Sequence, residues 1–180
     1  GEQYAAHLSA IVEILDLKVH ENIDVSRIMP VDDVFHIDTN SERYTAKHVI
    51  WAAGDFQYPK LTGFAGSDNC RHIATIPSYA ELDGDEFIVI GGYESGVDAA
   101  YNLAKYGKRV QLFDKECPWD LGTSDPSVAL STYSYERMRS DCFTKNVLLR
   151  PYSPIAAVNQ LDSTYEVITP DGERFKTPTQ

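Results

Sequence analysis

The stretch Val89-Ile90-Gly91-Gly92-Tyr93-Glu94-Ser95-Gly96 decides how the rest of the sequence is interpreted. It continues the apolar run Phe87–Ile90, which is typical of a buried strand, and it opens a segment, 95–106, whose apolar residues recur at helical spacing. A glycine-rich turn between a strand and a helix presents backbone N–H groups and the positive end of the helix dipole to a pyrophosphate. The stretch therefore predicts a dinucleotide-binding turn.

The residues around this turn predict a βαβ unit. Gly107 is placed to stop the helix, and Arg109–Phe113 reads as a second apolar strand, which gives a unit of about thirty residues as in nucleotide-binding sheets. A further helix over 131–142 and a strand over 146–150 follow. We expect an α/β fold with a Rossmann-like parallel sheet.

The turn departs from the pattern G-x-G-x-x-G at one position. Gly91 and Gly96 match the first and third glycines, but Tyr93 stands where a middle glycine lets the pyrophosphate approach the backbone. Gly92 is expected to supply some of the missing flexibility. Two alternatives stay open, namely an ordinary tight turn and a turn that Tyr93 blocks. The candidate phosphate-binding residues are Gly91, Gly92, Tyr93, Glu94, Ser95 and Gly96.

The end of the second strand carries the candidate ribose-binding residues. Asp114 follows Gly96 by 18 residues, close to the spacing at which an acidic side chain meets the ribose hydroxyls of NAD. Lys115, with Lys108 and Arg109 upstream, could instead attract the 2′-phosphate of NADP. Asp114 favours NADH and the basic residues favour NADPH, so the cofactor is NAD(P)H with the choice left open.

An internal repeat at an offset of 130 residues accompanies this unit. The segments Val34–Thr39 and Arg43–Ala46 read as a hairpin with alternating apolar residues, and 165–169 with 174–177 reads as a second one. The fold class therefore includes antiparallel β-meander hairpins. The matched pairs are Val19 and Leu149, Val25 and Ile155, Ile28 and Val158, Asp32 and Asp162, Phe35 and Tyr165, Ile37 and Val167, and Thr39 and Thr169.

Composition excludes several classes of protein. Of 180 residues, 43% are hydrophobic and 24% charged, as in folded soluble domains, and the net charge of −11 disfavours binding to nucleic acid or to an anionic membrane. The longest apolar runs are far shorter than a membrane span, so we expect a cytoplasmic protein.

The sequence offers no metal site and no clear catalytic group. Three widely spaced cysteines and five scattered histidines lack the spacing of metal ligands, and no side chain is a convincing acid, base or nucleophile, so the catalytic residues are unknown.

With these residues in view, the chain resembles the two-dinucleotide-domain flavoproteins, and within them the flavin-containing monooxygenase-like group. The resemblance runs over nearly the whole chain. It rests on the glycine-rich turn, on the apolar strand and small-residue turn of 49–59, on Gly63-Phe64-Ala65-Gly66 and on Asp125-Pro126-Ser127-Val128. Ala53 and Tyr93 replace residues usual in the family pattern, a threonine and a glycine.

The resemblance implies a division into two domains. Residues 1–58 would form the later part of an FAD-binding domain, with Ala53 and Gly54 at the edge of the FAD site, and 59–180 would form most of an NAD(P)H-binding domain. The FAD-binding glycine turn would precede residue 1 and the second domain would continue past residue 180. We therefore expect the chain by itself to be inactive and not to hold FAD tightly.

The resemblance implies a flavin-dependent oxidoreductase, with monooxygenase-like chemistry as the main hypothesis and hydride delivery from NAD(P)H to FAD as the role of this part. A disulfide reductase of the same architecture is the alternative, although the Cys-x-x-Cys of thioredoxin reductases is absent here. A nucleotide-free packing or regulatory module is the third. The expected partners are the dinucleotide and a small-molecule substrate, and the oligomeric state is open, a homodimer included.

Overall fold

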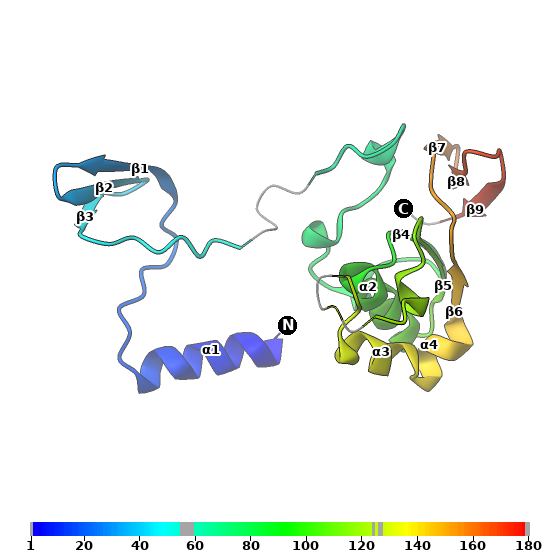
Figure 1. The fold of residues 1–180 in the computed structure, drawn as a ribbon, viewed down its shortest axis with the longest axis horizontal. Helices are drawn as coiled ribbons and strands as arrows, with labels where there is room; N and C mark the ends of the chain where they lie inside the picture. Colours follow the sequence, from blue (N-terminus) through cyan, green and yellow to red (C-terminus); the bar gives the residue numbers. More distant parts are fainter. Residues whose placement is uncertain (1, 55–59, 124, 126–127, 179–180) are drawn as a thin grey trace. The chain divides into compact units, whose positions relative to one another are not determined.

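The computed structural model describes residues 2–54, 60–123, 125 and 128–178 (Figure 1). The chain separates into two compact units, Gly1–Gly54 and Asp55–Gln180. Among the described residues, no helix combines the length and the apolar composition that a membrane crossing requires.

A parallel sheet organises the second unit. Its strands β4 (Glu86–Ile90), β5 (Arg109–Phe113) and β6 (Val147–Arg150) lie in the order β4-β5-β6. Helix α2 (Glu94–Lys105) connects β4 to β5 and is stopped by Gly107, whose φ of 77° no other residue type adopts as easily. The N–H of the next residue, Lys108, donates to the Leu103 carbonyl and closes the helix. The predicted Rossmann-like βαβ unit is confirmed.

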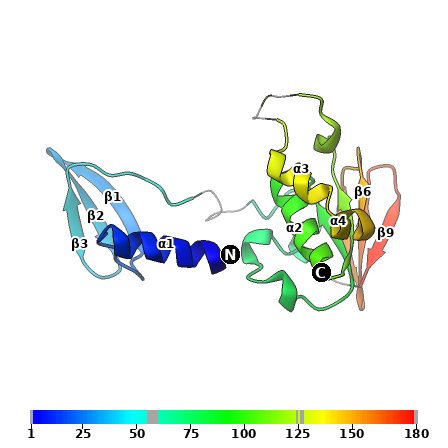
Figure 2. The same ribbon diagram turned by 90° about the horizontal axis from the view of Figure 1, so that it is seen from below.

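Helices cover one face of this sheet (Figure 2). Val97, Ala100 and Leu103 of α2 pack on Val110 and Leu112 of β5, and all five are buried. The expected single helix over 131–142 is instead two, α3 (Thr132–Met138) and α4 (Asp141–Asn146). They separate because Ser140 is extended (ψ 150°) and its hydroxyl caps α4 by accepting from the Phe143 N–H, which ends α3.

A three-stranded antiparallel meander belongs to each unit. In the second unit it consists of β7 (Ala157–Leu161), β8 (Thr164–Ile168) and β9 (Arg174–Thr177), and Phe175 contacts Phe113 of β5 edge to face. In the first unit it consists of β1 (Val25–Val31), β2 (Val34–Thr39) and β3 (Arg43–Ala46).

The internal repeat corresponds to these two meanders. Asp32 and Asp162, one repeat apart, both have positive φ (52° and 42°) in the turn between the first two strands. Aspartate tolerates this conformation better than most residues, which explains its recurrence. The strand register is also repeated, because Ile37 faces Tyr44 as Val167 faces Phe175.

The buried strand expected over 48–53 is absent. These residues have no ladder partner among the described residues, and the side chain of Ile50 is 89% exposed. An apolar run becomes a strand only where another strand satisfies its backbone groups. Helix α1 (Glu2–Ile14) precedes the meander in the first unit. Short 3₁₀ helices lie in the second unit: Ser67–Asn69, Ile73–Thr75, Tyr79–Glu81 and Pro118–Asp120.

Candidate dinucleotide-binding site

The turn between β4 and α2 has the geometry that its first and third glycines allow. Gly91 has a φ of +98°, a conformation that favours glycine, and its N–H donates to the Phe113 carbonyl at 2.9 Å. Gly96 is buried, and a Cβ on it would lie 1.6 Å from the Gly91 oxygen. The helix therefore approaches the turn as closely as a missing side chain permits, which is the packing role of the third glycine.

The first turn of α2 supplies N–H groups for an anion. The first intrahelical hydrogen bond runs from the Val97 N–H to the Tyr93 carbonyl at 2.9 Å, so the N–H groups of Glu94, Ser95 and Gly96 precede it. The N-cap residue Tyr93 makes no side-chain cap. Backbone donors at the positive end of a twelve-residue helix, beside a glycine turn, fit the pyrophosphate of a dinucleotide.

Asp114 lies at the carboxyl end of β5, beside the glycine turn. Its Oδ2 accepts from the Gly92 N–H at 2.7 Å, and its Oδ1 accepts from the N–H groups of Glu116 (2.7 Å) and Cys117 (3.0 Å). The structure thus brings Asp114 and the turn together, as the spacing predicts. Lys115 projects outward and pairs with Glu116 at 3.1 Å.

Trp119 is a residue of this site that sequence reasoning missed. Its indole N–H donates to the Gly92 carbonyl at 2.8 Å, and its ring would lie 2.4 Å from a Cβ on Gly92. Gly92 therefore makes room for an aromatic ring rather than supplying flexibility alone. The only available signal was the presence of a tryptophan in the loop that follows β5.

Tyr93, at the position of the middle glycine, connects the turn to the segment before α3. Its hydroxyl donates to the Ala129 carbonyl at 2.9 Å, and the side chain is 41% exposed. The tyrosine has a hydrogen-bonding partner of its own, so its occurrence in the turn has a structural reason.

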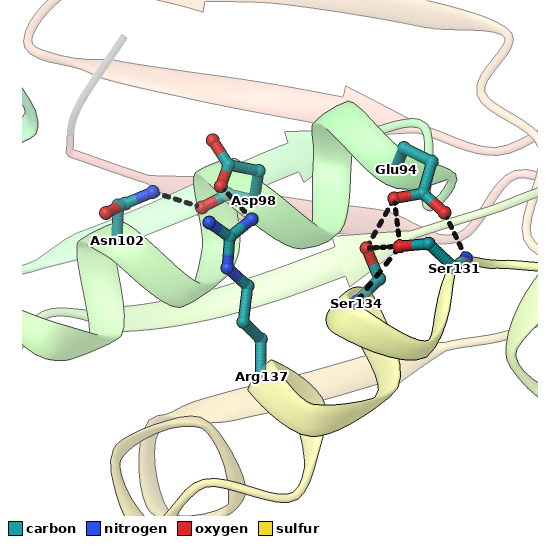
Figure 3. A network of polar contacts seen from close by, with 6 residues as sticks. All are labelled: Glu94, Asp98, Asn102, Ser131, Ser134 and Arg137. Atoms are coloured by element: carbon teal, nitrogen blue, oxygen red, sulfur yellow. Dashed lines mark hydrogen bonds and ion pairs between the residues drawn. The ribbon is translucent and has the colours of Figure 1, made fainter. Parts of the chain in front are cut away.

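Glu94 fastens α3 to the start of α2 (Figure 3). Its carboxylate accepts from the backbone N–H and hydroxyl of Ser131, the N-cap of α3, and from the hydroxyl of Ser134. Partial burial raises the pKa of Glu94, but these hydrogen bonds and the charge of Arg137 outweigh it, so the pKa is lowered. Arg137 pairs with Asp98 one turn further along α2.

The two remaining predicted site residues, Ala53 and Gly54, belong to the first unit. Ala53 and Gly54 end the first unit in a segment outside its helix and strands, where Gly54 has a φ of +77° and open space on its Cβ side. Within the described part of the chain, no three acidic, histidine or cysteine side chains come together as metal ligands.

Cys70 borders a mainly apolar cavity of about 280 Å³ against β4, and burial together with the charge of Asp68 raises the pKa of the Cys70 thiol.

Comparison with known proteins identifies the family. The chain is 34% identical over 81 residues to bacilliredoxin reductase Bdr of Bacillus subtilis (45% of this chain and 25% of that protein) and 27% identical over 108 residues to an uncharacterized oxidoreductase CzcO-like of Geobacillus kaustophilus (58% and 31%). It therefore spans about a third or less of the length of these curated relatives.

Solved structures show the same fold. Bacillithiol disulfide reductase Bdr from Bacillus cereus has a TM-score of 0.68 at 19% identity, covering 98% of this chain and 53% of that one. Thioredoxin reductase from T. acidophilum has a TM-score of 0.68 at 19% identity, covering 99% and 56%. These relatives support the broader flavoprotein family and not the monooxygenase-like group in particular. The model of the pyridine nucleotide-disulphide oxidoreductase family matches residues 1–180, and the chain belongs to that family.

Proposed function

We propose that the chain is the NAD(P)H-binding part of a flavin-dependent oxidoreductase that reduces a low-molecular-weight disulfide. The observation that carries the proposal is the β4–α2 turn, where the first N–H groups of α2 lie beside Gly91 and Asp114. Membership of a family of pyridine nucleotide-disulphide oxidoreductases supports it.

In this proposal, different residues of the site bind different parts of the dinucleotide. The N–H groups of Ser95 and Gly96 bind the pyrophosphate, and the carboxylate of Asp114 accepts a hydrogen bond from the adenosine ribose. Ala53 and Gly54 stay assigned to the FAD side of the protein, as the resemblance implies. When bound, the two cofactors would supply the hydride transfer, and no side chain of this chain is assigned a part in that step.

The cysteines favour a small disulfide as substrate over a dithiol relay within the described chain. Cys70, Cys117 and Cys142 are all free, and Cys117 is buried. The raised pKa of Cys70 keeps its thiol protonated at neutral pH, which makes it a weak nucleophile. The balanced reaction is NAD(P)H + H⁺ + RSSR → NAD(P)⁺ + 2 RSH.

The name of the Bacillus cereus neighbour, a bacillithiol disulfide reductase, supports this substrate class over monooxygenation. The discriminating experiment uses the whole FAD-containing enzyme, of which this chain is the NAD(P)H-binding part, and gives it reduced nicotinamide without oxygen, together with bacillithiol disulfide, glutathione disulfide or cystine. We expect two thiols to appear per NAD(P)H oxidised with at least one of these. If NAD(P)H is oxidised only after oxygen is added and no thiol is released, the disulfide-reductase proposal is wrong, and transfer of an oxygen atom to an organic substrate would favour the monooxygenase hypothesis.

The nucleotide-free alternative has its own test. Calorimetric titration of the chain with NADH and NADPH should show saturable binding of at least one. If the parent chain binds neither and Tyr93→Gly binds one, Tyr93 blocks the turn and the binding proposal is wrong.

A further inference from the structure

We propose that this site selects NADH over NADPH, through the carboxylate that Asp114 holds at the end of β5. The inference rests on the proposed function, because it concerns the same dinucleotide. NADPH differs from NADH only by a phosphate on the adenosine 2′-oxygen. In βαβ units of this kind, an acidic residue at the end of the second strand bonds that 2′-hydroxyl.

Three backbone hydrogen bonds fix the position of the Asp114 carboxylate. They come from Gly92 in the turn and from Glu116 and Cys117 in the loop after β5. A carboxylate has about four acceptor sites, so one site on Oδ2 is left for a hydroxyl donor. A ribose hydroxyl can donate there, whereas a phosphate oxygen can only be repelled.

Two of the basic residues that could have attracted a 2′-phosphate lie at the wrong end of the strand. Arg109 begins β5 and Lys108 precedes it, so at about 3.3 Å per residue they lie about 17 Å and about 20 Å from Asp114. Lys108 donates to the Gly84 carbonyl at 2.6 Å, and Arg109 pairs with Glu86. Neither residue therefore lies where it would attract a 2′-phosphate beside Asp114.

The basic side chains at the carboxyl end of the sheet already have partners. Lys115 pairs with the neighbouring Glu116. Arg150, at the end of β6, donates twice to the Gln111 side chain (3.1 and 3.0 Å) and lies over the Phe175 ring. Neither side chain therefore offers a 2′-phosphate an unpaired bidentate guanidinium, which is the usual phosphate ligand.

The test compares dissociation constants of the 180-residue chain for NADH and NADPH by titration calorimetry at low and moderate salt. We expect NADH to bind at least tenfold more tightly, with the difference shrinking as salt rises because like-charge repulsion is screened. In Asp114→Ser, the ratio should fall below about threefold, since 1.4 kcal/mol corresponds to tenfold and the repulsion is removed.

Two further variants test whether the preference for NADH comes from the Asp114 carboxylate in particular or from the negative charge of the loop in general. Asp120→Asn removes a charge from the same loop without removing a hydrogen bond to the glycine turn, and should keep the ratio. Glu116→Gln releases Lys115 but keeps the backbone N–H that Asp114 accepts, so it should tighten NADPH binding two- to threefold even if Asp114→Ser does not fold. Equal affinities in the parent, or tighter NADPH binding, would overturn the preference alone. Binding of neither nucleotide would overturn the proposed function with it.

Discussion

Gly96→Ala tests whether the close approach of α2 to the glycine turn is what builds the site. The new methyl group would lie 1.6 Å from the Gly91 oxygen and 2.8 Å from its carbonyl carbon, and contacts below 3.0 Å are essentially never observed. Helix α2 and the turn must therefore separate by more than an ångström. Because the obstacle is backbone, no side-chain rotation relieves the contact.

The expected stability change follows from two opposing contributions. Overpacking of a buried position against backbone costs about 3 kcal/mol, and alanine recovers about 1 kcal/mol of helix propensity, which leaves a destabilisation of about 2 kcal/mol. For a unit of this size the melting temperature should fall by about 8 °C. Since misplacement of binding groups by an ångström can cost about a hundredfold, NADH affinity should fall at least tenfold.

Thermal unfolding by circular dichroism and calorimetric NADH titration measure the two effects, and two other glycines supply controls. Gly122→Ala meets nothing within 4 Å and should change stability by less than about 0.5 kcal/mol. Gly107→Ala also meets nothing but has a φ of +77°, so it should cost about 1 kcal/mol of stability and leave NADH binding unchanged. A Gly96→Ala chain with parental melting temperature and parental NADH affinity would show that the close approach of α2 to the turn does not build the site.

Two more predictions concern the segment joined to the turn. The lowered pKa of Glu94 means that its hydrogen bonds stabilise the fold above its unfolded-state pKa, near 4.5, and that this contribution is lost as pH falls through the lower folded-state value. Urea unfolding of Glu94→Gln between pH 3 and 7 should therefore show a flatter pH dependence than the parent, and parallel curves would contradict the assignment. Tyr93→Phe removes the hydrogen bond to Ala129 and should cost about 1 kcal/mol in the same assay; an unchanged midpoint would mean that this bond contributes nothing.

Much of the fold was predictable because its signals are local. Strand and helix periodicity placed β4, α2 and β5, and the recurrence of Asp32 as Asp162 revealed the two meanders. The repeat worked as evidence because a turn with positive φ selects the same few residue types wherever it occurs. The strand expected over 48–53 was not predictable in this way, because it depends on a non-local partner. The apolar run is present, but no strand of the described chain pairs with it.

At the site, local sequence signals identify the residues of the turn and the acidic residue after the next strand, because both depend on local backbone conformation and on the fixed length of a βαβ unit. The packing in three dimensions was needed to show that Trp119 occupies the space at Gly92, that Glu94 holds α3, and that Lys108 lies at the far end of β5 from Asp114. These relations join residues brought together across loops and helices. No periodicity encodes which side chains meet there, since the contact depends on how the elements pack and on which end of a strand a residue occupies.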